Sequence, residues 1–440
     1  MRARTLLKVA ASVAAVAALS SGCLQSDDGG GDDPGTGGGG EVEGSEVNVW
    51  VSVDQVVVDG LQEAIDPLAE ELGMTINLEK VENINQLIVT RVQAGDPPDI
   101  AMIPQPGVVA DLASRGALTP LDFLDVDSLE ENMTAGTVEA GRVDGEFYGL
   151  LASMNVKSLV FYPKKAWDAA GYEVPESLGE LADLTEEIKA DGTTPWCMGI
   201  ESETATGWPA TDWFEDLIMR FGGVEGYNSW VTHETPFDSD LVREAAAYFE
   251  ELLFTEGNVV GGREAIASTN FGTAGNPLFD DPAGCMLLKQ GSFITTFFPE
   301  EIQADLPGEV GVFGFPPAEA GGENPVLGGG DLAVLLKDSA GARAAMEILA
   351  NPEIGEIPAQ SGSNYISPFK TFDTSLYPSE IHRSAAEVAY SSSSFLFDGS
   401  DQMPGAVGAG TFWRDLTAWI SGQQDLDTAL TNIDDSWPAS

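Results

Sequence analysis

The chain has 440 residues, of which 43% are apolar, so it is long and apolar enough to fold into two domains with separate cores. Its 71 acidic residues outnumber 20 basic residues, which gives a formal net charge of −51. Nucleic acid is excluded as a partner because its binding requires a basic surface, and anionic ligands are disfavoured for the same reason.

The first 22 residues have the pattern of a signal peptide. Basic residues precede an apolar run at 9–19, which is too short to cross a bilayer and ends in small residues before Cys23. The letters LSSGC at 19–23 resemble the bacterial lipoprotein signal, although Ser20 stands where that signal usually has Leu. The resemblance implies a lipid on Cys23; the alternative is a cleaved signal followed by a free thiol.

The next segment, residues 23–45, is rich in Gly and Asp, and between 25 and 45 its one apolar residue is Val42. Such a segment cannot bury itself, so we expect a flexible tether between the membrane anchor and the folded body. Its glycines lack the Lys and the following helix of a phosphate-binding loop, so we expect no nucleotide site there.

The remaining cysteines and the histidines limit the chemistry. Cys197 and Cys285 form an even pair in what should be an oxidising compartment, so we expect a disulfide, with two buried free thiols as the alternative. His233 and His382 lie far apart without a partner motif. A catalytic triad or a histidine-rich metal site is therefore not expected, and we predict no cofactor, no metal and no enzymatic activity.

After the tether, strand and helix patterns alternate. Period-two and period-three-to-four apolar spacings predict strands at 46–53, 74–81 and 99–104 and helices at 57–72 and 84–95. This β-α-β-α-β order predicts a mainly parallel sheet with helices on both faces. Ligands bind at the carboxyl ends of such strands, so the loops at 52–55 and 104–107 are expected at the binding edge.

A second alternating region follows. Ser177 and Glu180 have the spacing of a capping box and predict a helix start. We further expect these elements: strands at 158–163, 196–200, 284–293, 310–315 and 328–337, helices at 211–221, 240–254 and 339–353, and three helices between 378 and 437.

Four segments, at 96–107, 149–172, 207–213 and 412–423, together with the lipoprotein-like start, resemble the extracellular solute-binding proteins of ABC importers, in their maltose- and α-glucoside-binding branch. The resemblance covers the chain from about 46 to its end. It implies an α/β, two-lobed, type II periplasmic-binding-protein-like fold, in which each lobe is a mainly parallel sheet flanked by helices. The implied N-lobe is 46–154 plus 326–370 and the C-lobe is 155–325 plus 371–440, with crossing segments near 153–157, 314–328 and 366–374.

The same resemblance implies a monomer on the outer face of the cytoplasmic membrane that captures a neutral sugar by hinge closure and delivers it to an ABC importer permease. A sugar ring offers an apolar face and a fringe of hydroxyls, so its site needs flat aromatic side chains and fixed polar groups. The candidate ligand-binding residues are Asp54, Gln55, Gln105, Ser153, Asn155, Trp208, Asp212, Trp213, Phe293, Asp331 and Trp413.

Alternatives remain open at this point. Trp213 lies at the edge of an apolar helix face and could be a core residue, and Asp212 could simply cap that helix. Aromatic walls with carboxylates also suit a cation such as a polyamine. A third alternative on the same residues is a glycoside hydrolase, which needs two acids at a defined separation.

Overall fold

The computed structural model describes residues 41–438. The expected signal peptide, Cys23 and most of the expected tether lie outside these residues. The last tether residues differ from the expectation, because 41–45 form a turn against the folded body: the Gly44 N–H donates to the Gly73 carbonyl at 2.8 Å, and the Ser45 carbonyl accepts from Thr75 at 2.9 Å. The folded body therefore begins about five residues earlier than the strand pattern indicates.

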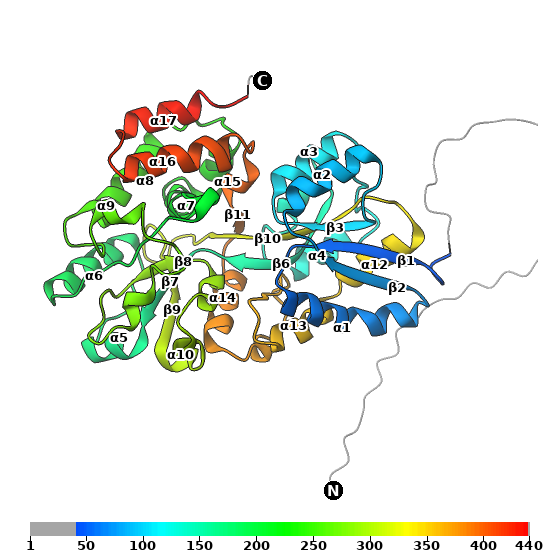
Figure 1. Ribbon diagram of the computed structural model, residues 1–440, viewed down its shortest axis with the longest axis horizontal. Helices are drawn as coiled ribbons and strands as arrows, with labels where there is room; N and C mark the ends of the chain where they lie inside the picture. The colour runs from blue at the N-terminus through cyan, green and yellow to red at the C-terminus, as the bar shows by residue number, and fades with distance from the viewer. Residues whose placement is uncertain (1–40, 439–440) are drawn as a thin grey trace, which may run out of the picture. The chain divides into compact units, whose positions relative to one another are not determined.

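The structure contains eleven strands among the described residues (Figure 1). They are β1 (Glu46–Val51), β2 (Thr75–Lys80), β3 (Ile100–Ile103), β4 (Arg142–Val143), β5 (Glu146–Phe147), β6 (Gly149–Val156), β7 (Leu159–Pro163), β8 (Leu288–Gln290), β9 (Val310–Gly314), β10 (Val326–Leu335) and β11 (Phe395–Phe397). The first α-helices are α1 (Gln55–Glu71), α2 (Ile84–Ala94), α3 (Pro106–Ser114), α4 (Val126–Asn132), α5 (Lys164–Ala170), α6 (Leu178–Ala190), α7 (Trp208–Val231), α8 (Asp240–Phe249) and α9 (Arg263–Ile266). The others are α10 (Glu300–Gln303), α11 (Leu306–Glu309), α12 (Ala340–Leu349), α13 (Glu356–Gln360), α14 (Glu380–Tyr390), α15 (Gly399–Gln402), α16 (Trp413–Ile420) and α17 (Leu426–Asp434).

The larger sheet has the order β11-β10-β3-β1-β2, and β6 pairs with β10. β1 runs parallel to β2 and β3, which confirms the succession predicted from the sequence. β10 is antiparallel to both β3 and β6 and parallel to β11. The sheet is therefore mixed, and the carboxyl ends of β1 and β3 lie at the same edge, where the expected binding loops begin.

The smaller sheet has the order β8-β7-β9, and both of its pairings are antiparallel. The expectation of a mainly parallel sheet in each lobe is wrong for this one. β7 is separated from each of its partners, β8 and β9, by more than a hundred residues of chain, so the local strand and helix alternation carried no information about strand direction. The expected strand at 196–200 is reduced to bridges, in which Trp196 pairs in parallel with Val259 and Leu287.

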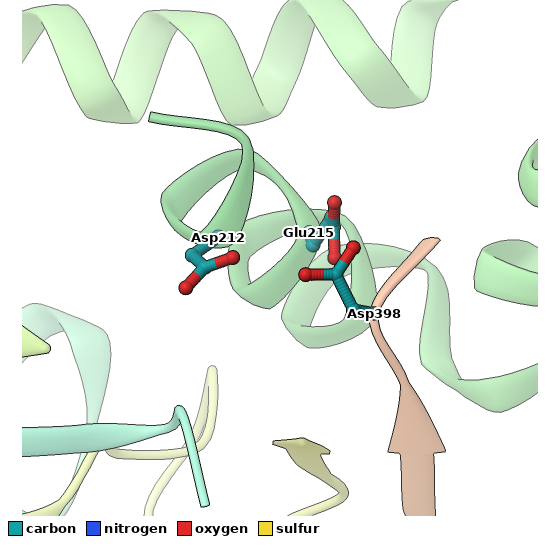
Figure 2. A group of neighbouring side chains, drawn as sticks. All are labelled: Asp212, Glu215 and Asp398. Atoms are coloured by element: carbon teal, nitrogen blue, oxygen red, sulfur yellow. The ribbon is translucent and has the colours of Figure 1, made fainter. Parts of the chain in front are cut away.

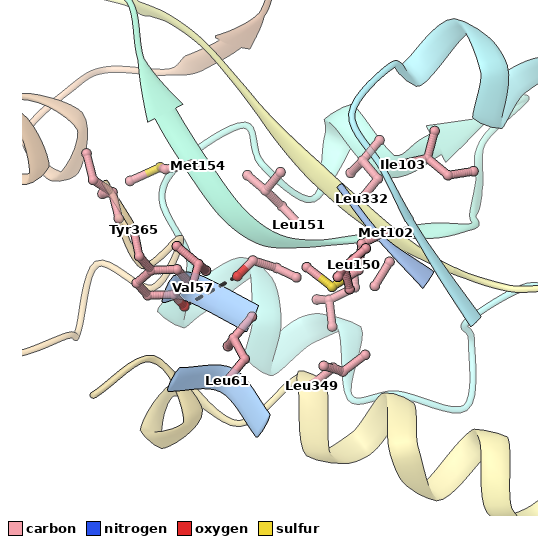
Figure 3. Close-up of a cluster of buried hydrophobic side chains, with 14 of the residues drawn as sticks. Val57, Leu61, Met102, Ile103, Leu150, Leu151, Met154, Leu332, Leu349 and Tyr365 are labelled. Atoms are coloured by element: carbon pink, nitrogen blue, oxygen red, sulfur yellow. Dashed lines mark hydrogen bonds between the residues drawn. The ribbon is translucent and has the colours of Figure 1, made fainter. Parts of the chain in front are cut away.

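Two clusters of buried apolar residues form the cores. One packs the larger sheet against α1 and α12, and Figure 3 shows part of it, with side chains such as Leu61, Met102 and Leu150 gathered together. The other packs α7, α8 and α16. β10 serves both, because Leu327 belongs to the second cluster and Leu332 to the first. β6 and β10 run side by side in Figure 1, so this paired ribbon joins the two cores.

Two sequence signals at helix ends have clear counterparts. The Ser177 hydroxyl accepts from the Glu180 N–H at 3.2 Å and caps α6 as expected. Gly207 is the N-cap residue of α7; its φ is +117°, and a Cβ there would lie 2.6 Å from the Trp413 carbonyl oxygen. Glycine thus permits both the left-handed backbone and the close approach of α7 to α16. α7 also runs ten residues past the expected end at 221, with a kink at Gly223.

Candidate ligand-binding site

A pocket of about 280 Å³ lies where the loop after β1 meets the β6–β10 ribbon. Five of the eleven candidate residues line it: Asp54, Ser153, Asn155, Phe293 and Asp331. The other lining residues, which the sequence analysis did not single out, are Ser52, Val53, Val57, Pro104, Met154, Asn364 and Tyr365. Ser52 could have been predicted, because it lies in the expected binding loop after β1. No sequence pattern marks Asn364 or Tyr365 as a site residue.

Asp331 is the central polar group of this pocket. It is buried, and its two carboxylate oxygens accept hydrogen bonds from Ser52 Oγ at 2.5 Å and Ser153 Oγ at 2.9 Å. Burial raises the pKa of Asp331 above its ordinary value, and the two hydroxyl bonds oppose that rise. The two serines therefore hold a fixed acceptor in the pocket wall.

The backbone of β10 explains how Asp331 comes to this place. The pairing with β6 shifts register between Asp331 and Leu332, as in a β-bulge. At the neighbouring Gly330, φ is +157°, and a Cβ would lie 2.0 Å from the Ser153 carbonyl oxygen. Only glycine allows β6 and β10 to approach so closely, and the shift turns the Asp331 side chain toward the pocket.

A buried group of carboxylates surrounds Lys157, the residue that follows β6. Figure 2 shows Asp212 and Glu215 on α7 facing Asp398 at the end of β11. The Lys157 ammonium donates to Asp212 Oδ1 at 3.0 Å and also to Asp398 Oδ2. Lys157 therefore compensates two carboxylates at once, and we call Lys157, Asp212, Glu215 and Asp398 the lysine-carboxylate cluster.

The electrostatics of this cluster are set by burial. Burial raises the pKa of Asp212 to about 7, against the pull of the Lys157 charge. Burial also acts to raise the pKa of Asp398, but the Lys157 charge and hydrogen bonds from Ser400 and the Asp401 N–H bring it below its ordinary value. Burial lowers the pKa of Lys157, yet the surrounding carboxylates more than reverse this, so the ammonium stays charged.

The structure places the remaining candidates outside this pocket. Trp213 is 2% exposed and packs against Trp196 and Phe315, so its ring lies in a core and not in the wall of this pocket. Asp212 is likewise buried, with its carboxylate held by Lys157. A carboxylate that already accepts from an ammonium inside the protein is a poor acceptor for a ligand hydroxyl.

Gln55 and Gln105 also have partners within the protein. The exposed Gln55 Nε2 donates to Asp59 Oδ1 at 2.8 Å, and Gln55 does not line the pocket. Gln105 Nε2 donates to Asp401 Oδ1 at 3.1 Å, beside a second pocket of about 510 Å³ between α3 and α15. Gln105 thus connects the edge of the larger sheet to α15.

Trp208 and Trp413 are partly exposed, and Trp208 lies next to a residue of the first pocket. The Trp208 ring is 5.7 Å from the ring of Phe293, which lines the pocket, and the Lys157 ammonium lies 5.3 Å from the Trp208 centroid. Trp413 begins α16 and packs against Gly207. Its indole nitrogen is buried and has no hydrogen-bond partner among the described residues.

The expected disulfide is present. Cys197 and Cys285 are bonded, with Cα atoms 5.6 Å apart and a sequence separation of 88 residues. Within residues 41–438, no helix combines the length and the apolar character that crossing a membrane requires.

A fold with two cores, a connecting ribbon and a ligand-sized pocket beside that ribbon is typical of proteins that bind small solutes. The chain belongs to the family of bacterial extracellular solute-binding proteins, which it matches over residues 56–356.

Individual relatives extend this likeness to most of the chain. The chain is 38% identical to the osmoprotective compounds-binding protein GgtB of Synechocystis, over 90% of this chain and 94% of that protein. It is 39% identical to the α-glucosides-binding periplasmic protein AglE of Rhizobium meliloti, over 84% of this chain and 81% of that protein.

Solved structures with the same fold include the bacterial solute receptor AcbH, with a TM-score of 0.75 and 17% identity over 89% of this chain and 97% of that one. Another is the cyclic α-maltosyl-1,6-maltose binding protein of Arthrobacter globiformis, with a TM-score of 0.67 and 18% identity over 89% of this chain and 97% of that one. These likenesses establish the two-lobed solute-binding fold, as the sequence predicted.

Proposed function

We propose that this protein captures a neutral sugar, an α-glucoside or a short oligosaccharide, and delivers it to the permease of an ABC importer. The observation that carries the proposal is the identity of 38–39% to GgtB and AglE, whose names refer to osmoprotective compounds and α-glucosides. The pocket chemistry agrees with it, because an aromatic ring, Phe293, and a fixed carboxylate, Asp331, both line the pocket.

In this proposal the hydroxyls of the sugar donate to Asp331, and an apolar face of its ring rests on Phe293. Hydrogen bonds to a carboxylate are roughly twice as strong as neutral ones, and sugar C–H faces suit aromatic surfaces. Asp54, Ser153 and Asn155 line the same pocket and offer further polar groups. A micromolar affinity needs about −8 kcal/mol, which several such contacts supply once association costs are met.

Ligand capture proceeds by hinge closure between an N-lobe of 46–154 plus 326–370 and a C-lobe of 155–325 plus 371–440. A ligand that contacts both lobes shifts the population toward the closed state. The β6–β10 ribbon is the proposed hinge, because it contributes to both cores. The hydrogen bond between Gln105 and Asp401 is one contact that closure would strengthen.

The chain acts outside the cytoplasmic membrane as a monomer held by a lipid on Cys23. Support for the extracytoplasmic place comes from the family, and support for the anchor comes from the LSSGC letters at the start of the chain. Radiolabelled palmitate supplied to cells would mark the wild-type protein and leave a Cys23→Ala variant unlabelled. Labelling of both proteins, or of neither, would contradict the anchor.

The function is tested by isothermal titration calorimetry of the purified body with trehalose, sucrose, maltose and glucose. We expect at least one glucoside to bind with micromolar affinity and to raise the melting temperature, because a ligand of the native state stabilises it. A matched Asp331→Asn variant keeps the shape of the acceptor but removes its charge, and we expect it to bind the same sugar about tenfold more weakly. If none of the four saccharides binds, the sugar proposal is refuted.

A cationic solute is the second candidate. It is favoured by one observation: Asp54 and Asp331 both line the pocket, and none of its lining residues is basic. Calorimetric titration with spermidine distinguishes the two ligand classes. If spermidine binds and none of the sugars does, the ligand is a polyamine and not a sugar. As to catalysis, we propose that none occurs, and release of glucose from maltose or trehalose on incubation would contradict this.

A further inference from the structure

An unbroken row of aromatic rings leads from the pocket to the protein surface. Phe293 lines the pocket, and its ring centroid lies 5.7 Å from that of Trp208. Trp208 lies 5.0 Å from Phe271, and Phe271 lies 5.1 Å from Phe297. Neighbouring rings at these distances are in direct contact. We call Phe293, Trp208, Phe271 and Phe297 the aromatic row.

The outer end of the row is open to solvent. Phe297 is 47% exposed, and it is the one exposed aromatic side chain among residues 41–438. Phe271 and Trp208 are partly exposed. Phe297 thus extends the partly exposed rings of Phe271 and Trp208 to the surface, and a contiguous apolar surface that adjoins a pocket is a candidate ligand-binding groove.

The backbone around the row holds the rings in place. A Cβ at Gly272 would lie 2.6 Å from Phe297 Cδ1, so the glycine lets the Phe297 ring lie against the chain. The Gly272 N–H donates to Asn270 Oδ1 at 3.0 Å, and Asn270 Nδ2 donates to Glu201 Oε2 at 2.7 Å. The Phe271 N–H donates to the Glu201 carbonyl at 3.0 Å. This bonding fixes the loop before a ligand arrives, which lowers the entropy cost of binding.

The size of the pocket indicates what the row is for. At about 280 Å³, the pocket lies at the lower limit for ligand sites, so it suits a single sugar ring. We propose that the ligand has at least two sugar rings and that its outer ring lies on Phe271 and Phe297, which form a second subsite. This inference rests on the proposed sugar function and specifies the length of the ligand.

The test compares Phe297→Leu with wild type in calorimetric titrations of glucose, maltose, maltotriose, trehalose and sucrose. Leucine keeps the apolar character but removes the flat ring. We expect wild type to bind at least one of the larger saccharides more tightly than glucose, and Phe297→Leu to lose about 3- to 10-fold on that ligand and less than about 2-fold on glucose. The control is Leu72→Ala, which alters an exposed apolar residue at the end of α1 and should change neither affinity.

A second variant displaces the Phe297 ring without replacing Phe297 itself. Gly272→Ala forces the Phe297 ring aside, so we expect the same selective loss on the larger saccharide, with the melting temperature recorded for each variant. An equal loss on glucose and the larger saccharide, or no loss, would overturn the second subsite. Wild-type binding of glucose alone would overturn it while the sugar function stands. A failure of wild type to bind any of the five sugars would overturn both.

Discussion

His382 is a buried residue whose titration we expect to affect the stability of the whole fold. It lies on α14 and is 4% exposed, and neither ring nitrogen has a hydrogen-bond partner among the described residues. Burial lowers the pKa of His382 below its ordinary value of 6.5. Below about pH 6.5, His382 therefore binds a proton in the unfolded chain but not in the folded chain. The free energy of unfolding consequently falls as the pH falls.

The prediction compares wild type with His382→Phe in urea unfolding at pH 7.5 and 5.5. The variant has no titrating group at this position, so it should not share the loss of stability that wild type shows at low pH. The free energy of unfolding of the variant minus that of wild type should therefore be about 1 kcal/mol larger at pH 5.5 than at pH 7.5. The difference between the two pH values cancels any constant effect of repacking. A gap that does not change with pH would show that His382 titrates normally in the fold.

Single residues also mark the limit of what the sequence revealed about the site. Asp54 was predicted because it follows the first strand, and Asp331 because it adjoins a glycine run that allows close approach of the backbone. Both residues line the pocket. Trp213 was a candidate because indole rings bind sugars. Its ring instead packs in the core against Phe249 and Phe315, which come from distant segments that the local sequence does not reveal. Phe271 and Phe297 lie in irregular segments without a periodic pattern, and only the fold brings their rings together.

Lys157 acts at the scale of elements, because its side chain and its backbone together contact three of them. Its ammonium contacts Asp212 on α7 and Asp398 after β11, and its own N–H donates to the Leu327 carbonyl of β10 at 2.8 Å. Removing one partner from a buried ionic group leaves uncompensated charge in a medium that solvates it poorly. Lys157 is therefore expected to stabilise the junction of the β6–β10 ribbon with α7.

We predict that Lys157→Met lowers the free energy of unfolding by about 3–5 kcal/mol, as found for broken buried ion pairs. The matched control is Lys165→Met, whose side chain is 70% exposed and pairs with Glu309. Exposed pairs contribute about 1 kcal/mol or less. Urea unfolding of both variants at pH 7 provides the comparison, and equal losses for the two would contradict a special role for the buried lysine.

The predictability of the elements follows from how each one is stabilised. Helices such as α8 and α12 were evident from apolar spacing, since each buries one face. β11 was missed, because three apolar residues after a serine run show no period, and its place depends on pairing with β10 seventy residues earlier. The continuation of α7 was missed because Gly222 and Gly223 resemble a helix end, whereas the chain kinks and resumes.

At the scale of the whole molecule, the chain's length and alternation predicted two α/β cores and their order. The disulfide was predicted from the cysteine count and from the signal-peptide pattern of the first 22 residues. The direction of the strands in the smaller sheet did not follow, since β7 pairs with β8 and β9 only across long stretches of chain. Local pattern thus determines elements and their faces, while long-range pairing is determined by packing that a single sequence does not display.

The charge of the whole molecule leads to the last prediction. A formal net charge of −51 repels itself in the compact state, and salt screens that repulsion. Between 0.1 M and 1 M NaCl the screening length falls from about 10 Å to about 3 Å, so the urea midpoint at pH 7.5 should rise with salt. Urea is the proper denaturant because guanidinium is itself a salt. Near pH 4.1, where the net charge is close to zero, the rise should vanish. A midpoint that falls with salt at pH 7.5 would mean that attractive ion pairs outweigh the net repulsion.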